Sequence, residues 1–499
     1  MLNPGSRMLV AGGRILDLDG DLDQPAIADV LIENGRITAC EAGLAARLDA
    51  DVARLDARGK LVIPGLINAH YHSHDVLLRG MYEQLPLDLW FALSSPANYP
   101  LSADEVSLRT ALGAAECLLN GITTTQDMVT VTGANREHVD AIVAAYGQCG
   151  IRVVLALQIS DRATVAAVPF VRDLPADIVK RLPPPADPAA LQRVVEERLA
   201  GARHPRVGWG LGPSAPQRCS DALLSWVADL ARRHDLQVFT HVYEARSQCV
   251  LARMEYAQQS LLGHLDKFGL LGPRLTIAHG VWISRDEIRR MGAAGASLAC
   301  NPTSNLKLLN GFAPIVDYAE AGTGIGLGCD NCSGNDAQNM FETMKMFALL
   351  WGMYSTAGSS GAAREAFKGA TIGGARALGK ADELGRVRPG FRADLVLIDL
   401  QQPNYRPLNS ALRQLVYGES GRGVHTVIVD GQIVVENRRL RTVDEDGLKS
   451  RSEAARARLT ADVGRVKQQN ESLLPSLLAA YEKANQYPLE FDRFLLRRQ

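Results

Sequence analysis

The period of hydrophobic and polar positions changes along this chain and divides it into regions. From about Leu61 to Gly385, short apolar runs of strand length alternate with stretches in which apolar residues recur every three or four positions. This alternation predicts parallel strands joined by helical crossovers. Strands are expected at Leu61–Ile67, Thr123–Asp127, Arg152–Gln158, Val207–Gly212, Gln237–Val242, Leu275–Ala278, Ala296–Cys300 and Gly324–Gly328. The amphipathic stretches between them include Ala103–Asn120, Leu191–Ala202, Asp221–Arg233, Arg285–Met291 and Asn339–Leu350.

Two hairpins of similar sequence lie at opposite ends of the chain. Asn34-Gly35 and Asp430-Gly431 each separate two apolar runs, which is a strong signal for a tight β-turn. We therefore predict an α/β protein in which a (β/α)8 TIM barrel, residues 61–385, is inserted into a composite β-sandwich domain, residues 1–60 plus 386–443. Residues 444–499 form a C-terminal helical extension that serves packing or dimerisation. The proline-rich stretch Ala163–Asp187 is either a lid or a surface insertion.

Composition limits the kinds of partner. The chain has 54 Lys and Arg against 55 Asp and Glu, a formal charge of -1, so no global field favours nucleic acid or a membrane surface. A small-molecule substrate is expected instead. The 8 cysteines show no extracellular spacing pattern, and no apolar run reaches membrane-spanning length. These features predict a soluble, cytoplasmic protein. No Gly-x-Gly-x-x-Gly follows the first strand, so a dinucleotide site is not supported.

Side chains that can bind a metal ion stand at the carboxyl ends of several predicted strands. His70 and His72 are two positions apart, so on a strand they share one face. Other strands are followed or ended by His241, Glu244, His279 and Asp330. Barrel enzymes place their chemistry where these strand ends meet, so the six side chains are predicted to form one site.

Short sequence motifs surround each of these residues. They are Pro64-Gly65-Leu66-Ile67-Asn68-x-His70-x-His72, Gly121-Ile-Thr-Thr124, His241-x-x-Glu244, Ala278-His279, Asn301-Pro-x-Ser304-Asn305-Leu-Lys307-Leu308 and Gly328-x-Asp330. In combination they resemble the amidohydrolase superfamily. Within it the chain is similar to the cytosine-deaminase-like and chlorohydrolase-like branch, which includes S-adenosylhomocysteine/methylthioadenosine deaminases and triazine hydrolases. The resemblance extends to about residue 440 and implies a homodimer or larger homo-oligomer.

The residue types suit hydrolysis at a metal ion. The imidazoles of His70, His72 and His241 and the carboxylate of Asp330 are expected to hold one divalent cation and to leave a position open for water. The cation lowers the pKa of that water, and Asp330 is expected to take its proton as hydroxide attacks an sp² carbon. Zinc is expected by default, with Fe2+ as the alternative, because His-rich sites follow metal availability.

Two further residues are expected to be catalytic. Glu244 is placed to pass a proton to a ring nitrogen and then to the leaving amine, and His279 to hydrogen-bond the hydroxide or the developing tetrahedral oxygen. The resembling enzymes use these positions in the same roles. Binuclear relatives bridge two metals with a carboxylated lysine on the fourth strand. This chain has no lysine between Lys180 and Lys267, so a single metal is expected.

The sequence indicates the identity of the substrate less clearly than it indicates the reaction. Candidate substrate-binding residues are Glu83, Trp90, Ser214, Ser304, Asn305 and His74. Glu83 stands where adenosyl-type deaminases place an acid that binds ribose hydroxyls. Ser214, Cys300 and the pair Asn331-Cys332, however, replace residues that those deaminases usually carry around the purine. These changes favour another ring system over adenosylhomocysteine.

We therefore expect a metal-dependent hydrolase of C–N bonds that removes ammonia or an amine from a nitrogen heterocycle through a metal-activated hydroxide. One alternative is hydrolysis of an aryl amide, carbamate or urea, and another is deamination of S-adenosylhomocysteine or methylthioadenosine. A non-enzymatic scaffold with the same fold is a further alternative. Such a scaffold would have no reason to keep a complete set of metal ligands.

Overall fold

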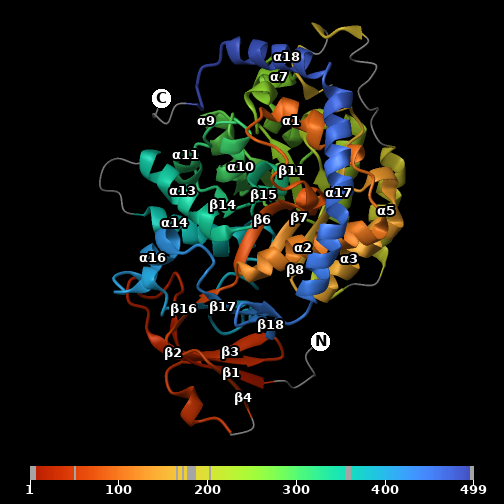
Figure 1. Cartoon of the computed structure of the whole chain (residues 1–499). Coiled ribbons are helices and arrows are strands. Elements are labelled where there is room, and N and C mark those ends of the chain that lie inside the picture. Colours follow the sequence, from red (N-terminus) through yellow and green to blue (C-terminus); the bar gives the residue numbers. More distant parts are fainter. Residues whose placement is uncertain are drawn as a thin grey trace.

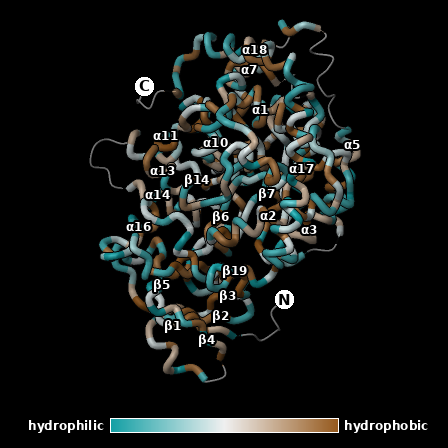
Figure 2. The backbone as a smooth tube through the Cα atoms, in the orientation of Figure 1, coloured by the Kyte–Doolittle hydropathy of each residue, from teal (hydrophilic) through white to brown (hydrophobic). Residues whose placement is uncertain are grey.

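A computed structural model of the chain describes residues 7–49, 52–163, 167–170, 173–176, 187–201, 204–354 and 361–494. It places a β-sheet domain at one end, a barrel in the middle and two C-terminal helices along the barrel's side and top (Figure 1). Hydrophilic segments lie at the periphery, for instance around helix α16, Ala411–Gly418 (Figure 2). Among these residues, no helix combines the length and the apolar character needed to cross a membrane. The expected lid or insertion, Ala163–Asp187, falls largely outside the described residues.

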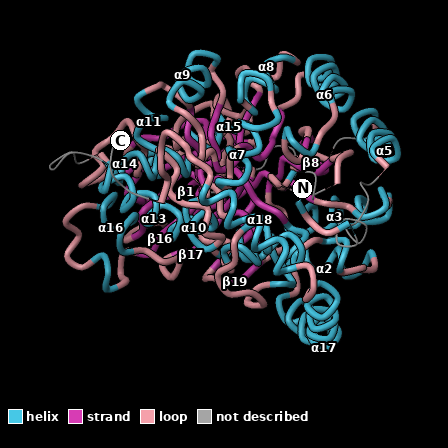
Figure 3. The backbone as a smooth tube through the Cα atoms, turned by 90° about the horizontal axis from the view of Figure 1, so that it is seen from above, coloured by secondary structure: helices cyan, strands magenta, loops and turns pink. Residues whose placement is uncertain are grey.

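The barrel is built of parallel strands that follow the predicted order. They are β6 (Leu66–His72), β7 (Ile122–Val129), β8 (Arg152–Ile159), β9 (Val207–Trp209) with β10 (Gly212–Pro213), β11 (Val238–Val242), β12 (Leu275–His279), β13 (Ser297–Cys300) and β14 (Gly324–Leu327). The short strand β15 (Asp330–Asn331) pairs with β6, and a bridge between Leu211 and Val238 joins β10 to β11. These two links close the strands into a barrel, which confirms the predicted fold class. Seen from above, the strands lie inside a ring of helices (Figure 3).

Helices connect and cover the barrel strands, and several begin where the sequence predicts. Ser220 and Ser284 cap α6 and α9 by accepting hydrogen bonds from the backbone N–H of Leu223 and Glu287. The helices of this region are α1 (Leu87–Ser94), α2 (Ala103–Leu119), α3 (Arg136–Cys149), α5 (Pro188–Ala200), α6 (Asp221–His234), α7 (Arg246–Glu255), α8 (Leu261–Lys267), α9 (Arg285–Ala294), α10 (Pro302–Lys307), α11 (Ile315–Glu320), α12 (Cys332–Asn335), α13 (Met340–Tyr354), α14 (Ala362–Lys368) and α15 (Gly374–Ala377).

Strands from both ends of the chain share one continuous nine-stranded sheet. They are β1 (Arg7–Ile15), β2 (Ile27–Glu33), β3 (Arg36–Glu41), β4 (Ala53–Asp56), β5 (Lys60–Pro64), β16 (Leu395–Asp399), β17 (Val424–Val429), β18 (Gln432–Glu436) and β19 (Arg439–Leu440). Both predicted hairpins are present, and Asn34-Gly35 and Asp430-Gly431 have positive φ, as the tight turn requires.

One strand prediction is wrong at its start. Residues Lys60–Pro64 form β5, which pairs with β1 and β16 in the small sheet, so the first barrel strand begins at Leu66 instead of Leu61. The apolar run is continuous in sequence because both strands are fully buried, and hydrophobicity therefore does not mark the boundary between them. Arg152, at the base of β8, joins the two domains through a buried ion pair with Asp394 at 3.1 Å.

The C-terminal extension consists of α17 (Glu445–Asn470) and α18 (Leu474–Gln486), and both helices pack on the barrel's rim. Val463 and Val466 join a buried cluster with Leu93 of α1, and Leu477 joins another with Leu89. Val463, Val466 and Leu477 are thus buried within their own chain, whereas Leu478 of α18 is 40% exposed. Packing against the barrel is one of the two roles that the sequence predicts for the extension.

Candidate active site

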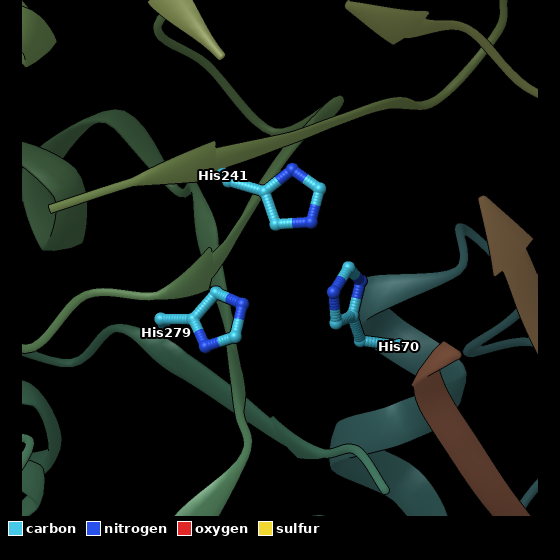
Figure 4. A group of neighbouring side chains, drawn as sticks. All are labelled: His70, His241 and His279. Atoms are coloured by element: carbon cyan, nitrogen blue, oxygen red, sulfur yellow. The ribbon is translucent and has the colours of Figure 1, made fainter. Parts of the chain in front are cut away.

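Four side chains meet at the carboxyl ends of the barrel strands. His70 and His72 end β6, His241 lies on β11, and Asp330 opens β15. His72 Nε2 lies 3.1 Å from His70 Nε2 and 3.2 Å from His241 Nε2. Asp330 Oδ1 lies 3.4 Å from the Nε2 atoms of both His70 and His72. Figure 4 shows the rings of His70 and His241, together with that of His279, around one common space.

The backbone fixes the protonation of two of these rings. Nδ1 of His72 is 2.6 Å from the Met128 carbonyl oxygen, and Nδ1 of His241 is 2.6 Å from the Ser214 carbonyl oxygen. A carbonyl only accepts, so each Nδ1 carries the proton and each Nε2 presents its lone pair to the centre. Burial lowers the pKa of His70 to about 4 and holds that of His241 well below its usual range. The rings of His70 and His241 are therefore neutral, as metal ligands must be.

Asp330 is arranged as an anion that faces these rings. Its Oδ2 accepts a hydrogen bond of 2.5 Å from Ser304 Oγ, while its Oδ1 is buried and has no hydrogen-bond donor among the described residues. Although burial opposes ionisation, His279 and His70 hold the pKa of Asp330 well below its ordinary value. The positive φ of 64° at Asp330 is strained backbone of the kind that collects at functional sites. A buried carboxylate oxygen beside neutral imidazoles fits a bound cation.

Glu244 and His279 lie on the other side of the same space. Glu244 Oε2 is 3.6 Å from His279 Nε2, and its Oε1 accepts a hydrogen bond from Asn310 Nδ2 at 3.2 Å. Burial, and then the charge of Asp330, raise the pKa of Glu244 well above its ordinary value. His279 Nδ1 is 2.8 Å from Asn305 Oδ1. This environment favours the protonated form of the Glu244 carboxyl, which is the form a general acid needs.

The geometry leaves some choice in the ligand set. Three overlapping groups of side chains have ligand atoms close enough to hold one ion: His70 with His241 and His279, His70 with His72 and Asp330, and Glu244 with His279 and Asp330. Every predicted ligand belongs to at least one of these groups. The site thus contains a His/Asp group that can bind a metal ion.

A cavity of about 130 Å³ opens beside this cluster. Of the expected substrate-binding residues, His74, Trp90 and Ser214 line it. Ser304 and Asn305 do not; they bond Asp330 and His279 instead. Glu83 also does not line it. Its side chain is exposed, because it lies in the loop before α1 and outside the helix that forms the cavity wall.

Sequence reasoning missed several polar residues of the cavity, among them Asp88, Gln217 and Arg218. Asp88 Oδ1 accepts a hydrogen bond from Ser247 Oγ at 3.0 Å, while its buried Oδ2 has no partner within the described part of the chain. Burial raises the pKa of Asp88 to about 6. The available signal was one acidic residue in the apolar run Leu85–Phe91, which on a wall helix points to a buried carboxyl.

Comparisons with known proteins agree with this geometry. The chain is 34% identical over 409 residues to a 5-methylthioadenosine/S-adenosylhomocysteine deaminase of Thermococcus kodakarensis, covering 82% of this chain and 89% of the relative. It is 30% identical over 457 residues to a 5'-deoxyadenosine deaminase of Methanosarcina mazei, covering 91% and 99%.

Solved structures with this fold include zinc-containing proteins. An adenosine deaminase of Xanthomonas campestris with bound zinc aligns with a TM-score of 0.81 and 27% identity over 92% of this chain and all of the other. An atrazine chlorohydrolase of Arthrobacter aurescens complexed with zinc aligns with a TM-score of 0.78 and 26% identity, covering 90% and 99%. The sequence model of the amidohydrolase family matches residues 61–434, which is most of the chain. The chain belongs to the amidohydrolase family.

Proposed function

We propose that this protein is a metal-dependent hydrolase that releases ammonia or an amine from a nitrogen heterocycle. One observation carries the proposal: three imidazoles and the unsatisfied Oδ1 of Asp330 surround one space, and Glu244 and His279 reach the same space from the opposite side. A scaffold without activity would gain nothing from burying these polar groups together, because their burial costs stability.

In this proposal His70, His72, His241 and Asp330 hold one divalent ion, zinc by default. The unsatisfied carboxylate oxygen and the Nε2 lone pairs fit such an ion, and the related adenosine deaminase and atrazine chlorohydrolase contain zinc. A bound divalent ion would act as a Lewis acid and would make a water molecule nucleophilic at neutral pH.

The side chains of this chain then move the protons. Asp330, whose carboxylate faces the ring cluster, accepts a proton from the attacking water. Glu244, which burial keeps protonated, gives its proton to a ring nitrogen and passes the next one to the leaving amine. His279, held through Nδ1 by Asn305, directs its Nε2 at the new oxygen. Water and the ring amine are consumed, and the hydroxylated ring and free amine are the balanced products.

The cavity wall supports a planar substrate that carries hydrogen-bond donors. Trp90 and Phe91 provide aromatic surface, and Asp88 Oδ2 and Gln217 Oε1 are buried acceptors that no described residue satisfies. A ring that bears N–H or amino groups would satisfy them, whereas an apolar ring would leave them unpaired at a cost of about 1–3 kcal/mol each. We therefore propose Asp88, in place of Glu83, as the acid that recognises the substrate.

A second candidate is deamination of an adenosyl compound. The observation that favours it is the identity of about one third to methylthioadenosine/S-adenosylhomocysteine deaminases along most of the chain. The exposed position of Glu83 disfavours it, because Glu83 is the acid that the resemblance assigns to the ribose contact.

Amine release across a substrate panel tests both candidates. The panel contains triazines, pterins, pyrimidines, purines and aryl ureas, together with S-adenosylhomocysteine and methylthioadenosine. The leading proposal predicts the highest kcat/KM for a heterocycle that carries exocyclic amines. Highest turnover of the adenosyl compounds would favour the second candidate, and turnover of aryl ureas alone would replace both by amide-type hydrolysis.

We also propose that the protein works in a reducing compartment, the cytoplasm, and as a homo-oligomer. All eight cysteines are free and seven are buried, which agrees with a reducing environment. Leu349 and Met353 lie one turn apart on α13 and are 51% and 62% exposed, so they can form part of an apolar contact. Sedimentation of the wild type against Met353→Glu tests this contact. A monomer for the wild type at micromolar concentration would refute the oligomer.

A further inference from the structure

The last described residues of the chain pack against Trp282 and against Arg246, which begins the helix that follows Glu244. These residues, 484–494, are called the C-terminal tail here, and they lie beyond the range that matches the family. In Figure 1 the chain runs from α18 back over the top of the barrel to its end. A chain of contacts runs from Glu244 through Asn310 and Trp282 to this tail.

Asn310 is the first residue of this chain of contacts. Its side-chain Nδ2 donates to Glu244 Oε1 at 3.2 Å, and its side chain is buried. Its backbone N–H donates to the Asn305 carbonyl at 2.8 Å, and its carbonyl accepts from Trp282 Nε1 at 2.6 Å. Asn310 is thus held from both ends of its own backbone, which fixes the direction in which its side chain reaches Glu244.

Trp282 is the second residue, and the tail covers it. It is fully buried, and its ring packs against Phe491 and Phe494 at centroid distances of 6.3 and 5.1 Å. The guanidinium of Arg246 lies 4.8 Å from the Trp282 ring centroid. Arg246 also donates to the carbonyls of Ala484 and Tyr487, at 3.1 and 2.7 Å. Arg246 therefore contacts both the start of the tail and the Trp282 ring, and the end of the tail covers that same ring.

The backbone beside Asn310 is shaped to receive the tail. Phe312 N–H donates to the Arg493 carbonyl at 2.8 Å, and Arg493 Nη2 donates to the Ile283 carbonyl at 2.8 Å. Gly311 lies between Asn310 and Phe312 with φ 103°, and a Cβ there would come within 2.7 Å of the Arg493 carbonyl oxygen. Glycine is needed at this position so that the tail can approach closely.

We propose that the C-terminal tail is a positioning element for Glu244, which acts through Trp282 and Asn310. This inference rests on the proposed proton transfer by Glu244. The tail holds the Trp282 ring in one orientation. The indole N–H of Trp282 then fixes the backbone of Asn310, and the side-chain amide of Asn310 fixes the Glu244 carboxyl. A carboxyl that can rotate loses the alignment on which proton transfer depends, and small misplacements have large effects on rate.

A double-mutant cycle between Trp282→Phe and Glu244→Gln tests the proposal. Phe keeps an aromatic ring against the tail and removes the indole N–H that Asn310 accepts, together with part of the buried ring system. We expect Trp282→Phe to lower kcat three- to tenfold, to change KM less than twofold and to keep the metal content. In the Glu244→Gln background the same change should lower kcat less than twofold, because the residue it positions can no longer transfer a proton.

The controls separate this proposal from the proposed function. Glu490→Gln removes a tail ion pair with Arg253 at 2.9 Å that does not reach Trp282, and it should leave kcat unchanged. Equal effects of Trp282→Phe in both backgrounds would overturn the positioning role alone. Full turnover by Glu244→Gln would overturn the role of Glu244 and this inference with it. If Trp282→Phe does not fold, the same cycle is measured with Asn310→Ser, which removes the amide that donates to Glu244 and leaves the tail residues unchanged.

Discussion

Replacement of Glu244 by glutamine separates proton transfer from metal binding. Gln has the same shape, and its amide oxygen can still accept the hydrogen bond from Asn310 that Glu244 Oε1 accepts at 3.2 Å. The backbone N–H of residue 244 keeps its bond to Gln248 at 2.8 Å. The imidazoles and the Asp330 carboxylate are unchanged. We therefore expect Glu244→Gln to fold normally and to bind its metal ion with the stoichiometry of the wild type.

The expected loss of activity follows from the environment of the carboxyl. Burial and Asp330 raise the pKa of Glu244 and so favour the protonated carboxyl, which carries a proton that an amide cannot deliver. General acid–base help contributes about 10²–10⁴-fold, and a loss of about 10²-fold in kcat corresponds to ~2.7 kcal/mol of transition-state stabilisation. The pKa of the leaving amine sets the loss within this range, since a more basic amine depends more on protonation.

The assay is steady-state amine release with elemental analysis of the same preparation. We compare substrates that share one ring and differ in the basicity of the leaving amine. The Glu244→Gln substitution should lower kcat by different factors for these substrates, and most for the substrate with the most basic leaving amine. If Glu244→Gln with full metal content retains kcat within threefold of the wild type, or if the loss is the same for all leaving groups, Glu244 is not the proton donor.

Other perturbations test the remaining parts of the site and fold. His72→Ala should abolish both bound metal and turnover, as measured by elemental analysis, while the wild type should contain one metal per subunit and not two. Asp88→Asn should lower kcat/KM about tenfold for substrates with ring amino groups and leave the metal content unchanged. In metal-free protein the contribution of Asp88 to the unfolding free energy should fall as the pH rises from about 4 to 6, because burial raises the pKa of Asp88 to about 6 and favours its neutral form in the folded state; urea titrations should show this fall as the difference between the wild type and Asp88→Asn. Arg152→Met should lower the unfolding free energy by about 3 kcal/mol, since it leaves the buried carboxylate of Asp394 without its partner, and a urea midpoint equal to that of the wild type would contradict this.

The barrel and the cluster at its rim were predictable because each rests on a local signal. Parallel strands buried on both faces are continuous apolar runs, and their ends are marked by polar residues such as His241 and Asp330. The two hairpins were equally clear, since only residues tolerant of positive φ, such as Asn34 and Gly35, fit a two-residue turn. Residue spacing alone was sufficient for these features.

The features that the sequence did not predict depend on contacts between segments far apart in the chain. The boundary between β5 and β6 is set by strand pairing with β1 and β16, which hydrophobicity does not report. The identity of the wall acid depends on where α1 docks, and α1 is held by α17 and α18, more than 350 residues away. The path from the C-terminal tail to Glu244 also depends on contacts between distant segments. The two residues between them, Trp282 and Asn310, lie in no recognisable motif.

The most direct test of the account is amine release measured as a function of bound metal. Metal-free protein is titrated with zinc, and ammonia or alkylamine release from the best substrate of the panel is recorded at each step. We predict no turnover without metal and a rate of amine release that rises linearly up to one equivalent of zinc per subunit and then stays constant. The His72→Ala variant should show no turnover at any step. Full turnover by metal-free protein, or a rise that continues to two equivalents, would contradict the account.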